Sequence, residues 1–242
     1  MATGFVYIQS LDIETTGARL HRNATTKGDV VFAIGSAVLR VPTTDDDGSR
    51  AQVVESRRWV LNIKPVGGAS WADAWKQNGW EQTCWDQFWS KHEAVLDALM
   101  TTTATQDVYS TEADMAASLN AYLQETETKY RSLRLVRVYD TVGFDVSNLD
   151  ALLERNGHHA VFLWRPPQDW PCNASYLGDV RNHALGVNPL IGATMEQKQM
   201  RQREDARALP SDVVHNHDPA QDALAIAHKW VHYARMASKK PQ

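Results

Sequence analysis

The chain has 242 residues and a formal net charge of −4, and 43% of its residues are hydrophobic. This length fits one domain, or one domain with insertions, and the apolar content supports a core. The negative charge argues against a broad basic nucleic-acid surface. No apolar run reaches the ~18 residues of a transmembrane helix.

The N-terminus and the cysteines indicate an intracellular protein. Residues 1–4 have neither the basic nor the apolar segment of a secretory signal peptide. Cys84 and Cys172 are too few for a disulfide framework and show no metal-binding spacing. We therefore expect a cytoplasmic protein that is not attached to a membrane.

The first part of the chain is predicted to form strands. Three apolar segments are expected to be strands: residues 5–13, 30–41 and 56–63. The polar residues 43–52, which contain an acidic run, are predicted to form the turn between the second and third strands. Residues 28–35, bounded by two glycines, can carry the earlier turn.

A tryptophan-rich segment follows over residues 71–100. Helical spacing predicts a helix over residues 82–100, with one side formed by Trp85, Phe88, Trp89, His92, Val95, Leu96 and Leu99. This spacing favours core packing for the aromatic rings of the helix. Trp75 and Trp80 lie near Gly79 in a less regular stretch. They are therefore the better candidates for stacking on unpaired bases.

The remainder of the chain alternates helices and strands. A helix is predicted over residues 111–130, where Thr111 and Asp114 resemble a capping box. The other predicted elements are a strand over 133–139, a helix over 147–156 closed by Gly157, short strands over 162–164 and 170–177, and a last helix over 218–236. This order predicts an α/β fold with a mixed sheet.

Two acidic residues stand out in the first predicted strand. Asp12 and Glu14 are two residues apart, so on a strand they share one face, while Leu11 and Ile13 face the other way. Two neighbouring carboxylates resist ionising together unless a cation lies between them. The pair therefore indicates divalent-metal chemistry, and a solvent-facing edge strand with ordinary acids is the alternative. The next residues are Thr15, Thr16 and Gly17.

A second group of ionisable residues lies near the C-terminus. His217 precedes Asp222 by five residues, and Asp218 with Pro219 offers an N-cap and an N1 proline to the last predicted helix. We therefore expect His217 just outside the helix, as a base, and Asp222 in its early turns, as a metal ligand. His215 is the rival base, two residues further from Asp222.

These motifs resemble those of the DEDDh 3′–5′ exonucleases. Residues 11–17 look like the first motif of that family, and the spacing from His217 to Asp222 matches its third. Residues 143–149 fit the second motif, with Asp145 as the metal ligand. Asp140 and Asp150 are its rivals. The tryptophan-rich segment and residues 178–181 look most like the phage exonuclease A branch.

The resemblance implies a fold, a metal set and a reaction. The fold is a ribonuclease H-like five-stranded mixed sheet flanked by helices, in one exonuclease domain over residues 1–242 with a tryptophan-rich helical insertion around 66–100. Four carboxylates from distant parts of the chain suit two Mg²⁺ or Mn²⁺ ions, and a histidine can accept the proton of the attacking water. The implied set is Asp12, Glu14, Asp145 and Asp222 as metal ligands and catalytic residues, with His217 as the general base.

The implied reaction is the release of nucleoside 5′-monophosphates from the 3′ end of single-stranded nucleic acid, with DNA favoured over RNA. An exoribonuclease on the same scaffold and a non-catalytic nucleic-acid-binding protein are the alternatives. The candidate substrate contacts are Thr15, Thr16, Gly17, Trp75, Trp80 and Arg181. A basic group, Lys198, Arg201, Arg203 and Arg207, either steadies phosphates or forms a solvated helix face.

Overall fold

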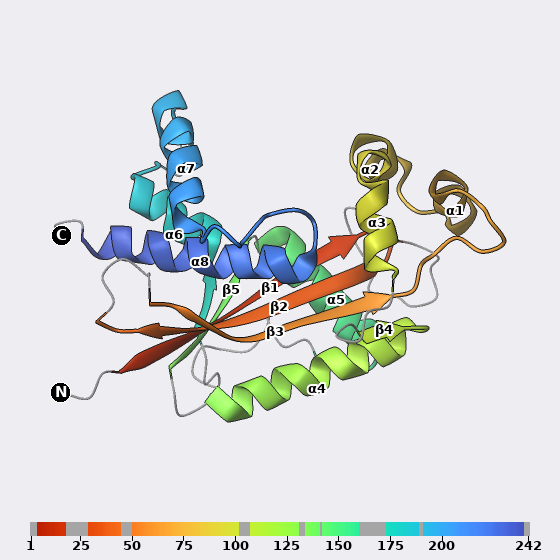
Figure 1. Ribbon diagram of the computed structural model, residues 1–242, viewed down its shortest axis with the longest axis horizontal. Coiled ribbons are helices and arrows are strands. Elements are labelled where there is room, and N and C mark those ends of the chain that lie inside the picture. The colour runs from red at the N-terminus through yellow and green to blue at the C-terminus, as the bar shows by residue number, and fades with distance from the viewer. Residues whose placement is uncertain are drawn as a thin grey trace.

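A computed structural model describes residues 4–17, 29–44, 50–101, 107–130, 134–140, 142–159, 173–188 and 191–239. Its centre is a six-stranded sheet in the order β4-β3-β2-β1-β5-β6 (Figure 1). The strands are β1 Phe5–Thr15, β2 Val31–Pro42, β3 Gln52–Leu61, β4 Asp107–Tyr109, β5 Leu135–Tyr139 and β6 Asn173–Tyr176. The expected number of strands was five, and the three-residue strand β4 was not predicted. The strand predicted over residues 162–164 lies outside the described residues.

The sheet is mixed, as predicted. β1 pairs antiparallel with β2, and β2 pairs antiparallel with β3, which gives the expected meander. The remaining pairs, β1 with β5, β5 with β6 and β3 with β4, are parallel. Among the described strands β2 alone runs against the others. The carboxyl ends of β1 and β5 therefore meet at one edge, where Glu14 and Asp140 are found.

Alternation along β1 separates the two faces of the sheet. Leu11 and Ile13 belong to a core that includes residues of α4, Glu112–Tyr130, and α5, Ser147–Arg155. Ile8 belongs to a second core that includes residues of α6, Leu177–Leu185, and α8, Pro219–Ser238. Figure 1 shows α4 and α8 on opposite sides of the sheet. None of the described helices combines the length and the apolar character needed to cross a membrane.

The predicted helix over residues 82–100 is interrupted. The segment forms α1 Trp71–Asn78, α2 Gln82–Gln87, a 3-10 turn Trp89–Lys91 and α3 Glu93–Leu99. Phe88 leaves helical geometry, with φ −128° and ψ −71°. The interruption lets Trp89 turn into the core, where its indole N–H donates to the Thr15 carbonyl at 2.9 Å. A tertiary hydrogen bond therefore replaces helix continuity at this point.

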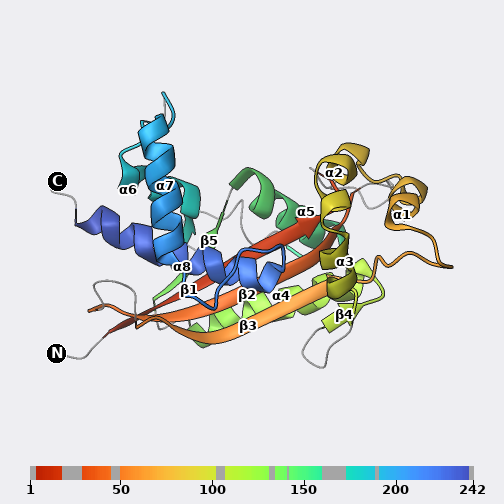
Figure 2. The ribbon, with the colours of Figure 1, turned by 45° about the horizontal axis from the view of Figure 1, so that its top comes forward.

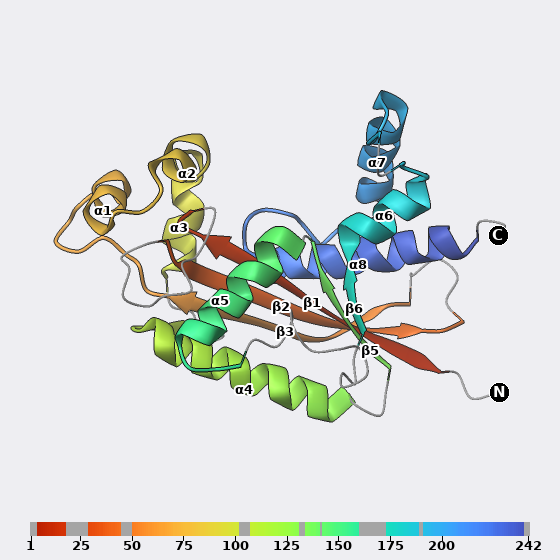
Figure 3. The same ribbon diagram turned by 180° about the vertical axis from the view of Figure 1, so that it is seen from behind.

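Other predicted elements are placed with small differences. Asp114 N–H donates to the Thr111 hydroxyl at 3.2 Å, which confirms the capping interaction at the start of α4. Residues 31–35 belong to β2, so the turn predicted over 28–35 is wrong for them. The polar stretch 196–207 falls within α7, Met195–Ala208. This helix has no buried residue and projects away from the sheet (Figures 2 and 3).

Candidate active site and metal centre

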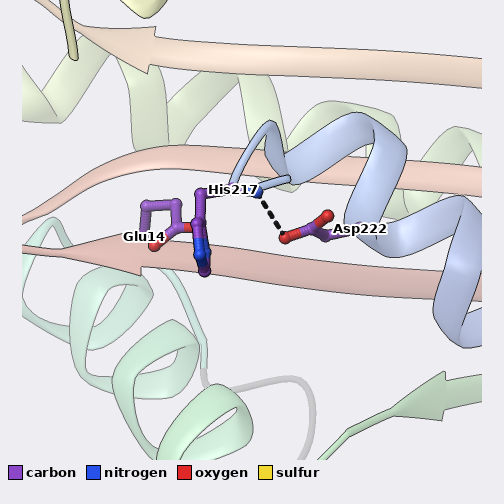
Figure 4. A group of neighbouring side chains, drawn as sticks. All are labelled: Glu14, His217 and Asp222. Atoms are coloured by element: carbon purple, nitrogen blue, oxygen red, sulfur yellow. Dashed lines mark hydrogen bonds and ion pairs between the residues drawn. The ribbon is translucent and has the colours of Figure 1, made fainter. Parts of the chain in front are cut away.

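Three predicted site residues meet at the carboxyl end of β1. Each of Glu14, His217 and Asp222 offers a ligand atom, and these atoms all lie within 4.8 Å of one another (Figure 4). Glu14 comes from β1, His217 from the loop before α8, and Asp222 from the first turns of α8. The first strand, the last helix and the loop before that helix therefore supply one group of side chains that could hold a metal ion.

Small side chains on the sheet allow α8 to approach this edge. Gly35 pairs with Asp12 across β1 and β2, so the two positions share a face. A Cβ atom at Gly35 would lie 1.9 Å from the Pro219 carbonyl oxygen. The buried Ser10 hydroxyl donates to the Ala223 carbonyl oxygen at 2.5 Å. The start of α8 thus packs directly on β2, at the residue that pairs with Asp12 of β1.

The N-terminus of α8 is fixed by a cap and an ion pair. The Asp218 carboxylate accepts a hydrogen bond from Ala220 N–H at 3.0 Å, and Pro219 follows in the first turn, as predicted. Arg58 of β3 pairs with the same carboxylate at 2.5 Å. Arg58 was not among the predicted site residues, because nothing in the local sequence links β3 to α8.

The loop before α8 is held by Asp222. The backbone N–H groups of Asn216 and His217 donate to the Asp222 carboxylate at 2.9 and 3.1 Å. His217 has a φ of 64°, a left-handed conformation that is uncommon for residues other than glycine. Its Nδ1 lies 3.7 Å from Glu14 Oε1, while His215 Nδ1 lies 3.1 Å from Asp222 Oδ1. Each histidine therefore lies beside one carboxylate of the group.

The electrostatics of the site disfavour carboxylate charge. Burial raises the pKa of Asp12 well above its ordinary value, and the negative charges of Glu14, Asp145 and Asp222 raise it further. Burial also raises the pKa of Glu14, although the interaction with His217 opposes this effect. The same interaction raises the pKa of His217. A cation among these groups would stabilise their charged forms.

Asp145 lies in the neighbourhood expected from the sequence. It is 4% exposed, in a π-helical turn, Val142–Val146, that leads into α5. Its charge raises the pKa of Asp12 more than that of Asp140 does. Asp150 is fully buried, and its charge raises the pKa of Tyr176, while Asp145 is among the charges that raise the pKa of Asp12. The electrostatic order therefore favours Asp145 over both rivals.

The threonines after Glu14 have partners within the protein. The Thr15 hydroxyl donates to the Gly17 carbonyl at 2.6 Å. Thr16 is fully buried, its N–H donates to the Val30 carbonyl at 3.0 Å, and its hydroxyl accepts from Val30 N–H at 2.9 Å. A Cβ atom at Gly17 would lie 2.0 Å from the Asp29 carboxylate carbon. These interactions hold the end of β1, and the Thr16 N–H predicted to contact substrate is already used.

The structure agrees with the predicted roles of Trp85 and Trp89 but not with that of Trp75. Trp85 and Trp89 are buried, which confirms the core packing expected for them. Trp75 is also fully buried, with its indole N–H donating to the Glu81 carbonyl at 3.2 Å. Its ring is covered by protein, so its position does not support base stacking. Trp80 is only partly buried and packs edge-on against Trp75 at 5.0 Å between ring centroids.

The basic candidates lie on two helices, Arg181 on α6 and the others on α7. Burial lowers the pKa of Arg181, and the charge of Arg201 lowers it further, while the charges of Asp205 and Asp140 oppose these effects. Two of the basic side chains of α7 pair with acids of the same helix: Arg201 lies 3.6 Å from Asp205, and Arg207 lies 2.6 Å from Glu204. These pairs agree with a solvated helix face, the alternative left open for this group.

Two further residues at the site were assigned to the core by the sequence. The rings of Phe88 and His92 each lie 4.7 Å from the His217 ring, measured between centroids. Both positions carried the signal of an apolar helical stripe, which does not distinguish a core contact from a contact with a site residue.

Comparisons with known proteins do not identify a family. No protein-family model matches the sequence, and no curated protein matches it significantly. The geometry of the site and the motif resemblance are therefore the basis for a function.

Proposed function

We propose that this protein is a divalent-metal-dependent 3′–5′ exonuclease with a ribonuclease H-like fold. Its proposed substrate is single-stranded DNA, and its products are nucleoside 5′-monophosphates. The observation that carries the proposal is the group formed by Glu14, His217 and Asp222, beside the buried Asp12, whose pKa is raised by the charges of Glu14, Asp145 and Asp222. The antiparallel meander extended by parallel strands supports the fold assignment.

The residues present fit Mg²⁺ or Mn²⁺. These ions prefer carboxylate oxygens: Glu14 and Asp222 lie at metal-ligand spacing, and the pKa of the neighbouring Asp12 is raised by burial and by the charges of Glu14, Asp145 and Asp222. Two ions would be held by Asp12, Glu14, Asp145 and Asp222. When bound, such ions lower the pKa of a coordinated water and stabilise charge on the phosphodiester oxygens.

His217 is the proposed general base. An imidazole titrates near ~6.5 in water, so it can accept a proton at neutral pH. Because Nδ1 faces Glu14 at 3.7 Å, Nε2 is the atom left to take the proton of the attacking water. Glu14 holds the ring orientation, and the backbone bonds to Asp222 hold the loop that carries it.

The polarity of the reaction and the preference for DNA come from the motif resemblance. The negative net charge agrees with a substrate held near its end rather than along a broad basic surface. An exoribonuclease would use the same metal site, since the contact that separates RNA from DNA is local.

The test is digestion of matched 5′-labelled single-stranded DNA and RNA with Mn²⁺, with Mg²⁺ and with chelator. Asp12→Asn is run beside the wild type, and Glu125→Gln, at an exposed position of α4, is the matched carboxylate control. We expect a metal-dependent ladder that shortens from the 3′ end, lost in Asp12→Asn and kept in Glu125→Gln. A faster ladder on RNA would reassign the substrate, and no ladder on either substrate would refute the exonuclease.

A further inference from the structure

The tryptophan-rich segment contacts the site near the 3-10 turn Trp89–Lys91, between α2 and α3. Trp89 is 1% exposed, and its indole N–H donates to the carbonyl of Thr15, the residue after Glu14. The neighbouring Phe88 ring meets the His217 ring edge-on, with an interplanar angle of 86° and a centroid separation of 4.7 Å. One turn of this segment therefore contacts both the strand and the loop that supply the site.

The interruption of the helix lies at this point of contact. The chain is helical before Phe88 and after His92, and the 3-10 turn lies between them. A short 3-10 stretch between helices often marks a functional or strained position. The Phe88 and His92 ring centroids are 4.8 Å apart, and each lies 4.7 Å from the His217 ring centroid. The departure from the predicted helix thus includes the three residues that contact the site, Phe88, Trp89 and His92.

His217 is a residue whose orientation needs support. Its backbone is left-handed, and its side chain remains 26% exposed. Glu14 lies on one side of the ring, while Phe88 and His92 pack on it at 4.7 Å each. Edge-to-face ring pairs at such separations are favourable beyond the area that they bury. The two aromatic rings therefore restrict the rotation that the exposed histidine would otherwise have.

We propose that Phe88 and His92 are positioning residues that hold the His217 imidazole in its proton-accepting orientation. The role of His92 is that of a ring and not of a metal ligand or a second base. Among the described residues, the group with metal-ligand spacing contains His217 but not His92. This inference rests on the proposed exonuclease function, because the orientation of His217 matters only if it acts on the substrate.

The kinetic test uses four variants. We expect His92→Ala and Phe88→Leu each to lower kcat roughly 10-fold with KM unchanged, less than the 10²–10⁴-fold effect of losing a general base. His92→Phe keeps a ring and should restore most of kcat. Gln87→Ala, an exposed neighbour in the same segment, is the matched control and should leave kcat unchanged.

Two kinetic results would overturn the proposal. If His92→Phe is as slow as His92→Ala, the ring is not what His92 contributes. If the variants raise KM and leave kcat unchanged, the two rings bind substrate rather than position His217.

A second measurement does not depend on activity. With ¹³C-labelled histidine, the ring resonances of His217, assigned by their loss in His217→Gln, should shift in Phe88→Leu and His92→Ala but not in Gln87→Ala. Unmoved resonances would overturn the positioning contact even in an active enzyme. If the variants show these shifts but the wild type digests no oligonucleotide, the exonuclease function is refuted, and the catalytic role of the two rings with it.

Discussion

Replacing Gly35 by alanine should inactivate the site while the protein remains folded. The new Cβ atom would lie 1.9 Å from the Pro219 carbonyl oxygen and 2.3 Å from Ala220 N. Ordinary van der Waals contact begins at 3.4 Å, so the first turn of α8 must move by about 1.5 Å to relieve the clash. Because both opposing atoms belong to the backbone, rotation of a side chain does not remove the overlap.

The displacement acts on catalysis more than on folding. His217 and Asp222 flank this turn, and a misplacement of ~1 Å costs roughly 10²-fold in rate. We therefore expect kcat to fall at least about 10²-fold. Overpacking of this kind lowers the free energy of unfolding by ~1–3 kcal/mol, within the ~5–15 kcal/mol of a typical domain.

The assay pairs exonuclease rates with urea unfolding. Gly178→Ala is the matched control, since its Cβ would lie 3.6 Å from the nearest atom, the Asp140 carbonyl oxygen, within ordinary contact. This change within α6 should keep the rate and add up to ~1 kcal/mol of stability. A wild-type rate in Gly35→Ala would refute the argument that the contact between β2 and α8 sets the geometry of the site.

Four further predictions concern the site and its surroundings. In chelator at neutral pH, Asp12→Asn should be more stable than the wild type, because the raised pKa of Asp12 means that its negative charge opposes folding. For the same reason, the free energy of unfolding of the wild type in chelator should rise as the pH falls toward the ordinary carboxyl range. Mn²⁺ at about 100 times its Kd should stabilise the wild type by ~2.7 kcal/mol and the variant by less, as measured by urea unfolding. His217→Ala should slow cleavage by roughly 10²–10⁴-fold and His215→Ala much less; the reverse ranking would make His215 the base. Burial raises the pKa of Cys84 to about 11, so iodoacetamide at pH 8 should label this thiol far more slowly in the folded than in the unfolded protein. Peptide mass spectrometry distinguishes its labelling from that of Cys172. Rapid labelling of Cys84 in the folded protein would contradict its burial.

The parts of the fold that the sequence predicts are those encoded locally. The alternation of Leu11 and Ile13 with the two carboxylates follows from the period of a strand, and the N-terminus of α8 follows from Asp218 and Pro219. Both signals act over a few residues, so they do not depend on the remainder of the chain. The expected separation of the two faces of β1 is confirmed for this reason.

The parts that could not be predicted depend on tertiary contacts. The break at Phe88 accompanies the bond from the next residue, Trp89, to Thr15 of the first strand. The sequence placed Gly35 both in the strand predicted over residues 30–41 and in a possible turn over 28–35; it lies within β2 and admits the backbone of α8. A glycine needed for close approach and a glycine needed for a turn look the same in one sequence. The two cases are distinguished only by the element that packs against the glycine, here the first turn of α8.

The site buries carboxylates at a cost in folding free energy, and contacts around it stabilise the fold. Asp12 and Glu14 are held where burial opposes their charge, so the site by itself destabilises the folded protein. The contacts that oppose this cost lie just outside it: Ser10 bonds to α8, and Arg58 pairs with the cap of the same helix. Conflicts between local preference and fold are expected at functional positions. A bound cation would remove the conflict and join the first strand to the last helix, so metal binding and the closure of this edge should be a single linked equilibrium.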